Sequence, residues 1–294
     1  MVFAIRPRRS VLYMPASNPR ALEKAKTLNA DGFVFDCEDA VAPDMKEVAR
    51  RQAIAAANSG DYGKREVVVR VNGLDTPWGY QDLVAVASCG AHAILLPKIQ
   101  SAEMVRRVEE ILLASGLREE TALWVMIETP LGVLNVREIA QATPRLRCMV
   151  MGTSDLSKDL QAQPSKDRLA LLTSLSMAVL AARAYGLSIM DGVHVDLTDD
   201  DGFTRACWQG VELGFDGKSL IHPKTIDTAN RIFAPSSESV SNARRIIAAH
   251  ADANNKGQGV VVVDGKMIEN LHVESAWRLV ELAEAIEELH KAGH

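Results

Sequence analysis

Residues Leu123–Pro130 read LWVMIETP, an apolar run that stops at one acid, Glu128, and is followed by a threonine and a helix-starting proline. The run is too short for a helix and too apolar for a half-exposed strand, so it predicts a strand buried on both faces. A second stretch repeats this plan, because RCMVM at Arg147–Met151 leads through Gly152 to Asp155. Two acids at the ends of two buried strands predict a divalent-cation site, whereas either acid alone could instead cap a helix.

Apolar, β-branched runs of this kind recur eight times along the chain, separated by Ala- and Leu-rich segments with charges on one side. The runs are Ser10–Met14, Gly32–Phe35, Glu66–Val71, Ala93–Leu96, Leu123–Ile127, Arg147–Met151, Leu187–Met190 and Gly214–Lys218. The segments between them include Arg20–Asn29, Lys46–Asn58, Ala102–Ser115, Arg168–Tyr185 and Asp201–Leu213. This eightfold alternation predicts an α/β fold, a (β/α)8 TIM barrel. The alternative, an open doubly wound sheet, would have a glycine-rich first turn, which is absent here.

The chain continues after the predicted barrel. Pro223–Phe233 is typical of the last barrel helix, so we expect a catalytic domain at residues 1–233 and an extension at 234–294. The extension is predicted to be a helix, a hairpin and a helix over Ser236–Asn254, Val260–Glu269 and Glu274–Leu289. The pair Asp264-Gly265 is a strong type I′ turn signal for the hairpin. Such an extension serves either as an oligomer interface or as a lid.

Composition places the chain among soluble globular proteins. Its 294 residues suit a barrel of about 250 residues with an extension. Hydrophobic residues make up 47% and charged residues 24%, which indicates neither disorder nor a membrane span. The formal net charge of −5 argues against nucleic acid as a partner, although a local basic patch could still hold an anionic ligand.

The cysteines and the N-terminus indicate the compartment. The four cysteines form no CxxC pair, so a zinc site or a disulfide framework is not expected; they are Cys37, Cys89, Cys148 and Cys207. The N-terminal MVFAIRPRRS lacks the apolar core of a secretory signal, and its arginines are typical of a solvated basic arm or the tail of a transit peptide. We therefore expect a cytoplasmic protein, with an organelle matrix as the alternative.

Polar residues follow most of the predicted strands. All strands of a barrel point their C-termini at one rim, so these residues are expected to converge on a single pocket. They are Pro15–Asn18, Asp36, Glu38, Asp39, Arg70, Asn72, Lys98, Glu128, Asp155, Asp191, Lys218 and His222. Among them we expect His222 to be structural rather than catalytic.

Eight stretches of the sequence carry a resemblance to a known family. They are RSVLYMPASNPRALEKA (9–25), FVFDCEDAVAPDMKEVARR (33–51), VVVRVNGLDTPWGYQDL (67–83), ILLPKI (94–99), WVMIETPLGV (124–133), GTSDL (152–156), GFDGKSLIHPKTI (214–226) and VVVDGKMIE (261–269). In this order they resemble the citrate lyase β-subunit-like branch of the hydroxy-acid aldolase and citrate lyase superfamily, which includes malyl- and citramalyl-coenzyme A lyases. The likeness runs through nearly the whole chain.

The resemblance implies a Mg²⁺ site held by Glu128 and Asp155, with Mn²⁺ able to replace Mg²⁺. Mg²⁺ prefers oxygen ligands and keeps several waters, so two carboxylates leave positions open for water and substrate. A 2-oxo acid such as glyoxylate or pyruvate would bind there beside Glu128, with its carbonyl polarised by the metal. Members of the family are trimers or hexamers, so the resemblance also implies a homo-oligomer.

Arg70 matches the active-site arginine of the family, which implies that it binds substrate and stabilises the oxygen that becomes negative during the reaction. The alternative is a structural salt bridge with Asp36 or Glu38. Asp36, Glu38 and Asp39 match the acidic motif of the family and are expected to support catalysis. Of these, Glu38 and Asp39 are assigned to the waters of the metal and to the orientation of Arg70, with Asp39 also facing the substrate.

The resemblance further implies coenzyme A contacts at Tyr13, Arg20, Lys24 and Lys46. The three cations would meet phosphates and the tyrosine would flank the nucleotide or pantetheine, unless the cations are simply solvated helix charges. Asp264 matches an aspartate of the family tail and is expected to act as an acid–base residue in the pocket of a neighbouring subunit. The alternative is that Asp264 only forms the turn.

The expected activity is a Mg²⁺-dependent carbon–carbon lyase acting on a 3-hydroxyacyl-coenzyme A of the malyl or citramalyl type. It would give acetyl-coenzyme A and a 2-oxo acid, or run in reverse. The alternatives are a malyl-coenzyme A thioesterase, a citrate lyase β subunit working on an acyl carrier protein, and a pyruvate aldolase. A catalytically silent subunit is disfavoured, because Glu128, Asp155 and Arg70 occur together.

Overall fold

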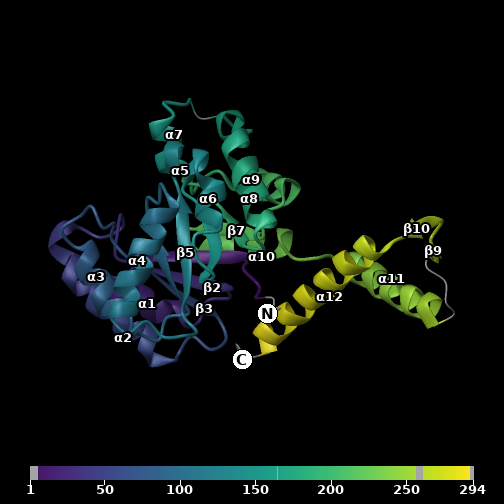
Figure 1. Cartoon of the computed structure of the whole chain (residues 1–294), viewed down its shortest axis with the longest axis horizontal. Coiled ribbons are helices and arrows are strands. Elements are labelled where there is room, and N and C mark those ends of the chain that lie inside the picture. Colours follow the sequence, from purple (N-terminus) through teal and green to yellow (C-terminus); the bar gives the residue numbers. More distant parts are fainter. Residues whose placement is uncertain (1–5, 164, 256–260, 292–294) are drawn as a thin grey trace. The chain divides into compact units, whose positions relative to one another are not determined.

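A computed structural model describes residues 6–163, 165–255 and 261–291. Eight parallel strands close into a barrel in chain order, and β8 pairs with β1 to complete it. The strands are β1 (Ser10–Pro15), β2 (Gly32–Asp36), β3 (Glu66–Arg70), β4 (Ala93–Leu96), β5 (Ala122–Ile127), β6 (Leu146–Met151), β7 (Ser188–Asp191) and β8 (Gly217–Leu220). Helices surround the strands (Figure 1). The predicted (β/α)8 TIM barrel is confirmed.

The barrel helices begin where the sequence supplies caps. Asn18, Ser101 and Thr129 each accept a hydrogen bond from a backbone N–H in the first turn of α1, α4 and α5, and a proline follows directly after two of them. The helices are α1 (Pro19–Ala25), α2 (Lys46–Ser59), α3 (Gly79–Val86), α4 (Ala102–Ala114), α5 (Pro130–Leu134), α6 (Val136–Ala140), α7 (Thr153–Asp159), α8 (Leu172–Ala184), α9 (Asp200–Leu213) and α10 (Ile226–Ile232). Short 3₁₀ turns lie at Pro43–Met45 (η1), Leu169–Leu171 (η2) and Pro223–Thr225 (η3).

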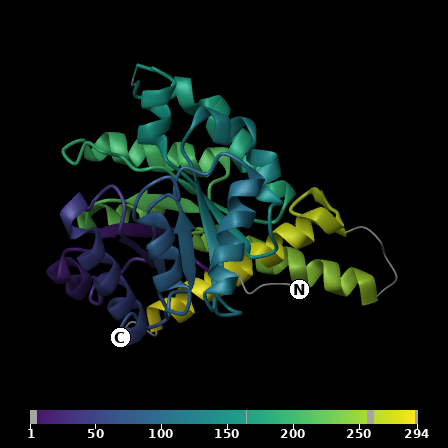
Figure 2. The ribbon, with the colours of Figure 1, turned by 60° about the vertical axis from the view of Figure 1, so that its left-hand side comes forward.

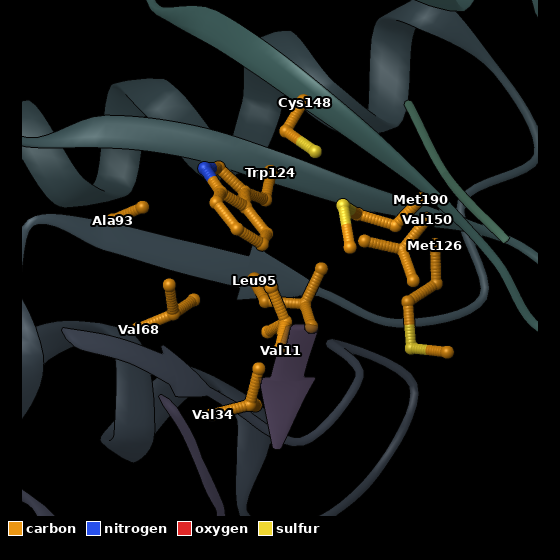
Figure 3. Close-up of a cluster of buried hydrophobic side chains, with 10 residues drawn as sticks. All are labelled: Val11, Val34, Val68, Ala93, Leu95, Trp124, Met126, Cys148, Val150 and Met190. Atoms are coloured by element: carbon orange, nitrogen blue, oxygen red, sulfur yellow. The ribbon is translucent and has the colours of Figure 1, made fainter. Parts of the chain in front are cut away.

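Alternate residues of the strands fill the barrel. In β5, Trp124 and Met126 belong to the interior cluster, while Val125 and Ile127 are fully buried on the opposite face. The interior cluster is Val11, Val34, Val68, Ala93, Leu95, Trp124, Met126, Cys148, Val150 and Met190 (Figure 3). Each large apolar side chain buried in this way contributes about 1.5–3 kcal/mol to stability. The prediction that β5 is buried on both faces is confirmed.

Two predicted strands begin later than expected. Strand β8 was expected from Gly214, but that glycine has φ of 95° and ends α9, and the N–H of Phe215 still bonds back to the helix. The prediction started β8 three residues too early because the same apolar run contains the helix cap. Strand β7 starts at Ser188, because the N–H of Leu187 donates to the carbonyl of Ala182 in α8.

The chain separates into two compact units, one of residues 8–231 and one that contains the C-terminal part from residue 232 onward. The second unit contains α11 (Ser237–Asn255), β9 (Val261–Val263), β10 (Lys266–Ile268) and α12 (Asn270–Lys291). Helices α11 and α12 lie side by side (Figures 1 and 2) and bury a small cluster of Ala243, Ala276 and Val280. The strands are joined by Asp264 and Gly265, with φ of 52° and 76°. The predicted helix, hairpin and helix with its type I′ turn are confirmed.

In the parts of the chain that the structure describes, no helix is both long enough and apolar enough to cross a membrane.

Candidate active site

A cavity of about 380 Å³ lies at the C-terminal ends of the barrel strands. Its walls come from residues that belong to or follow seven different strands, so the fold brings together groups far apart in the sequence. The lining residues are Tyr13, Pro15, Asp36, Asp39, Ala40, Arg70, Met126, Glu128, Met151, Gly152, Thr153, Ser154, Asp155, Val193, Ser219 and Ile221. Most of the predicted acids and Arg70 are among them.

Glu128 and Asp155 both border this cavity. Glu128 directly follows β5 and is 2% exposed, whereas Asp155 lies in the first turn of α7 with its side chain 37% exposed. Gly152 makes room for Glu128, because a Cβ atom at Gly152 would overlap Cβ and Oε2 of Glu128. The carboxylate of Glu128 therefore depends on a glycine at the end of the neighbouring strand.

The environment of Glu128 favours its neutral form. Burial raises the pKa of the Glu128 carboxyl to about 7, and the nearby carboxylate of Glu38 acts in the same direction. The backbone N–H of Lys98 donates a 2.6 Å hydrogen bond to Oε1 of Glu128, and Arg70 also favours the charged form. A metal ligand must be deprotonated, so a cation bound here would compete with this proton.

The donor atoms at this site suit a hard cation. Within the described residues, no cluster of three or more His, Cys, Asp or Glu side chains could enclose a metal ion. Glu128 and Asp155 instead offer two carboxylates beside an open cavity. Mg²⁺ commonly binds to one or two carboxylates and keeps water on its other positions, whereas structural zinc wants four protein ligands. The residues present fit Mg²⁺.

Arg70 is held in a fixed orientation beside this pair. Nε and Nη2 of Arg70 donate to the two carboxylate oxygens of Asp36 at 2.7 and 2.6 Å, and Nη1 lies 2.7 Å from Glu38. Asp36 and Arg70 are opposite one another in the pairing of β2 with β3, which explains the geometry. The guanidinium also packs on the ring of Tyr13, with 5.4 Å between its carbon and the ring centroid. The predicted salt bridge of Arg70 is present.

Lys98 was expected at the rim as one of the polar residues after the strands, but no role was predicted for it. It follows β4 with φ of 51°, a left-handed conformation that is uncommon for a residue with a side chain. Its Nζ donates to Glu38 at 2.6 Å and lies 3.6 Å from Asp39 and 3.8 Å from Asp155. The polar pattern after the strands included Lys98, but only the fold reveals these contacts.

Of the residues expected to bind coenzyme A, Lys46 is placed differently from the expectation. Its ammonium is buried and donates to the carbonyls of Cys37 and Glu38 and to Asn72. Lys46 therefore fixes the loop after β2 and does not present its charge to a phosphate, which corrects that assignment. Arg20 and Lys24 on α1 are exposed, and Tyr13 lines the cavity.

The expectation that all the strand-end charges converge on one pocket is also corrected. Asp191 and Lys218 are fully buried and joined at 2.7 Å, and Arg168 donates two further hydrogen bonds to Asp191. Asn72 is buried against Asp82. Asp191, Lys218 and Asn72 do not line the cavity, and their polar groups are hydrogen-bonded to other partners instead. His222 caps η3 by accepting from the N–H of Lys224.

Asp264 occupies the tip of the β9–β10 hairpin. Its two carboxylate oxygens accept from Arg245 at 2.6 and 3.2 Å, and both side chains are more than half exposed. An exposed ion pair of this kind contributes little to stability. The Asp264 carboxylate is accessible to solvent, and Asp264 has the left-handed backbone conformation that this turn requires.

An acid-lined cavity at the C-terminal rim of a (β/α)8 barrel defines a barrel enzyme. The family described as HpcH/HpaI aldolase/citrate lyase matches residues 9–223, and the chain belongs to this family of enzymes. This confirms the resemblance noted in the sequence.

Relatives of known name match the chain over nearly its full length. It is 49% identical to a (3S)-malyl-CoA thioesterase of Cereibacter sphaeroides, covering 97% of this chain and 98% of the relative. It is 37% identical to a citrate lyase subunit beta of Leuconostoc mesenteroides, covering 95% and 94%. A solved structure, CitE from Mycobacterium tuberculosis in complex with magnesium, acetoacetate and coenzyme A, is 27% identical with a TM-score of 0.75, covering 96% of this chain and 100% of that one.

Proposed function

We propose that this protein is a Mg²⁺-dependent thioesterase that hydrolyses a 3-hydroxyacyl-coenzyme A of the malyl type to the free hydroxy acid and coenzyme A. The observation that carries the proposal is the 49% identity, over almost the whole of both chains, to a (3S)-malyl-CoA thioesterase. The cavity supports it by joining two carboxylates suited to Mg²⁺ with a fixed arginine. The proposed thioesterase was an alternative in the sequence prediction, which favoured a carbon–carbon lyase.

Glu128 and Asp155 are the proposed ligands of the metal. When bound, the metal would supply a fixed positive charge for the hydroxyl and carboxylate oxygens of the malyl group. Binding of the cation would require the ionised carboxylate of Glu128, and burial raises the pKa of this group to about 7, so the cation would compete with a proton there. Asp155 would offer its carboxylate from the first turn of α7, where its side chain is 37% exposed. Together they orient the acyl group and leave the thioester free.

Arg70 is the proposed stabiliser of negative charge on the thioester oxygen. Water adds to the carbonyl carbon, the carbon–sulfur bond breaks, and the sulfur leaves as the coenzyme A thiol after taking a proton. Asp36 holds the guanidinium in place before substrate arrives, so little reorganisation is needed when the charge develops. Glu38 and Asp39 complete the orientation of Arg70, with Asp39 on the side that lines the cavity.

Coenzyme A is proposed to bind along Tyr13 and the exposed Arg20 and Lys24 of α1. The positive charges of Arg20 and Lys24 suit a diphosphate or the 3′-phosphate, and Tyr13 would flank the nucleotide or pantetheine. Asp264 is proposed to act as an acid–base residue in the pocket of a neighbouring copy, which requires a homo-oligomer. The protein is separately proposed to be cytoplasmic, as the sequence predicts. Mn²⁺ is proposed to replace Mg²⁺, because it accepts the same oxygen ligands.

A second candidate is carbon–carbon cleavage of the same substrate to acetyl-coenzyme A and a 2-oxo acid. It is favoured by the similarity to CitE, which was crystallised with magnesium, acetoacetate and coenzyme A. The citrate lyase subunit beta similarity points the same way. The same residues would serve, with Arg70 stabilising the enolate oxygen of the acetyl group.

Product analysis separates these functions. The purified protein is incubated with Mg²⁺ and (3S)-malyl-coenzyme A in H₂¹⁸O, and products are identified by mass spectrometry. Hydrolysis gives malate carrying one new ¹⁸O together with free coenzyme A, which is the expected result. Acetyl-coenzyme A with glyoxylate would establish the second candidate instead, and no turnover of the substrate would overturn both.

A further inference from the structure

Lys98 contacts both proposed metal ligands at once. Its backbone N–H donates to Glu128 at 2.6 Å, and its ammonium nitrogen lies 3.8 Å from Asp155. The two contacts come from one residue because the left-handed backbone at Lys98, with φ of 51°, turns the N–H toward β5 while the side chain extends across the rim. A residue with a Cβ atom keeps such a conformation only where its surroundings fix it.

The ammonium of Lys98 also binds the acids after β2. Nζ lies 2.6 Å from Glu38 and 3.6 Å from Asp39, and Glu38 in turn contacts Arg70. The side chain of Lys98 is 41% exposed, so it can move, whereas Glu38 is nearly buried. Lys98 therefore has a firm partner in Glu38 and a looser one in Asp155.

We propose that Lys98 is a positioning residue with two opposite effects on the divalent cation: its N–H orients Glu128 for binding, and its ammonium competes with the cation for Asp155. The proposal rests on the assignment of Glu128 and Asp155 as metal ligands in the proposed function. When the cation takes Asp155, the ammonium remains on Glu38 and Asp39. Lys98 thus keeps metal binding weaker than the carboxylates alone would make it.

The physical reason is the repulsion between an ammonium and a divalent ion that share one carboxylate. At separations of several ångström and the intermediate dielectric of a protein rim, removing one such charge changes an equilibrium constant by about tenfold or more. A merely structural role predicts the opposite sign. If Lys98 only neutralised the acids and held them in place, its loss would loosen the site and weaken metal binding.

The test measures Mn²⁺ binding to the full-length protein by isothermal titration calorimetry. Lys98→Met removes the ammonium. Lys98→Gly removes the ammonium and also relieves the strain of a side chain at positive φ, because glycine tolerates this conformation, and it keeps the N–H that reaches Glu128. Both variants are expected to bind Mn²⁺ about tenfold more tightly than the wild type. The Gly variant keeps the test valid if the Met variant is poorly folded.

Lys224→Met is the matched control. Lys224 is also a lysine after a barrel strand, its side chain is 37% exposed and it pairs with Asp200 at 2.7 Å, but neither residue lines the cavity. This variant is expected to leave the Mn²⁺ affinity within about twofold of the wild type, because its charge is screened by solvent. Unchanged or weaker Mn²⁺ binding in both Lys98 variants would overturn the proposal.

Glu128→Gln distinguishes this failure from failure of the proposed function. If the wild type binds Mn²⁺ and Glu128→Gln does not, the metal site stands, and the Lys98 variants alone decide the inference. If the wild type fails to bind Mn²⁺, or Glu128→Gln binds it equally well, the ligand assignment is wrong and both proposals fall.

Discussion

Asp36 and Arg70 end neighbouring strands in register and are joined by two hydrogen bonds of 2.7 and 2.6 Å. Both are buried, so the orientation of the guanidinium is set by the barrel rather than by the substrate. Asp191 and Lys218 are likewise opposite one another in the pairing of β7 with β8 and lie 2.7 Å apart, although Lys218 is near the start of β8, and neither lines the cavity. Of these two cross-strand ion pairs, only Asp36–Arg70 lines the cavity.

Arg70→Lys is expected to lower kcat by about 10²–10³-fold, the usual cost of losing a fixed donor to a developing oxyanion. Lysine keeps the charge but cannot form the two parallel hydrogen bonds to Asp36. Arg50→Lys is the control, because Arg50 pairs with the buried Asp82 at 2.6 Å and does not line the cavity. A kcat near normal for Arg70→Lys in the thiol-release assay would reduce Arg70 to a structural role.

Gly152→Ala is expected to weaken Mg²⁺ binding, because the added Cβ overlaps the side chain of Glu128. Overpacking of this kind also costs about 1–3 kcal/mol of stability. Gly186→Ala serves as the control. Gly186 has φ of 67° and an added Cβ atom would meet nothing within 4 Å, so alanine there introduces backbone strain without touching the site. Both variants should unfold at lower temperature, and only Gly152→Ala should need more Mg²⁺. Equal Mg²⁺ requirements in the two variants would show that Gly152 has no part in placing Glu128.

The raised pKa of Glu128 predicts how stability changes with pH when a chelator is present. Its folded pKa of about 7 lies above the ordinary value of 4.5, so the folded chain holds this proton more tightly than the unfolded chain. The resulting stabilisation is complete below about pH 4.5 and is lost as the pH rises toward 7 and above. The loss from this group is on the order of 3 kcal/mol, and the raised pKa of Glu38 adds in the same direction.

Urea unfolding at pH 5 and pH 8 measures this effect. In Glu128→Gln the free energy of unfolding should fall less between the two pH values than in the wild type, since the titrating group is gone. Saturating Mg²⁺ should offset the loss at pH 8, because the ionised carboxylate is then paired. Identical pH dependence in wild type and variant would mean that Glu128 titrates normally.

Asp264→Asn is expected to give a folded, Mn²⁺-binding protein with little activity if Asp264 is an acid–base residue. Asparagine tolerates the φ of 52° at this position, and the exposed ion pair with Arg245 contributes little stability, so the turn should survive. Mixing Asp264→Asn with Arg70→Ala under subunit exchange should restore part of the activity. Normal activity of Asp264→Asn alone would show that Asp264 only forms the turn. If the mixed variants recover no activity although their subunits demonstrably exchange, Asp264 does not act in a neighbouring subunit.

The sequence predicted the barrel because its signals are local and repeated. In β5, for example, the apolar run ends at Ile127, the acid Glu128 follows directly, and Thr129 caps the next helix. Where a run also contains a helix cap, as at Gly214, the same local signal misplaced the start of β8. The hairpin turn at Asp264-Gly265 was predictable because both residues must adopt positive φ.

The site was predictable only in part, because burial and partners depend on contacts between strands. Glu128, Asp155 and Arg70 follow from their positions at strand ends. Lys46 has the sequence context of a solvated helix charge, yet three acceptors from β2 and β3 loops enclose it. The role of Lys98 depends on a left-handed backbone and on acids from three other elements, which no local pattern reveals.

The most direct test of the central claim is the rate of thiol release from (3S)-malyl-coenzyme A as a function of Mg²⁺ concentration, in wild type and Glu128→Gln. Glu138→Gln on the exposed side of α6 is the control for the loss of one carboxylate. Saturable, Mg²⁺-dependent release is expected in the wild type and the control, with a loss of at least about 10²-fold in Glu128→Gln. Release that continues at the wild-type rate in Glu128→Gln, or in the presence of a chelator, would contradict the proposed metal site.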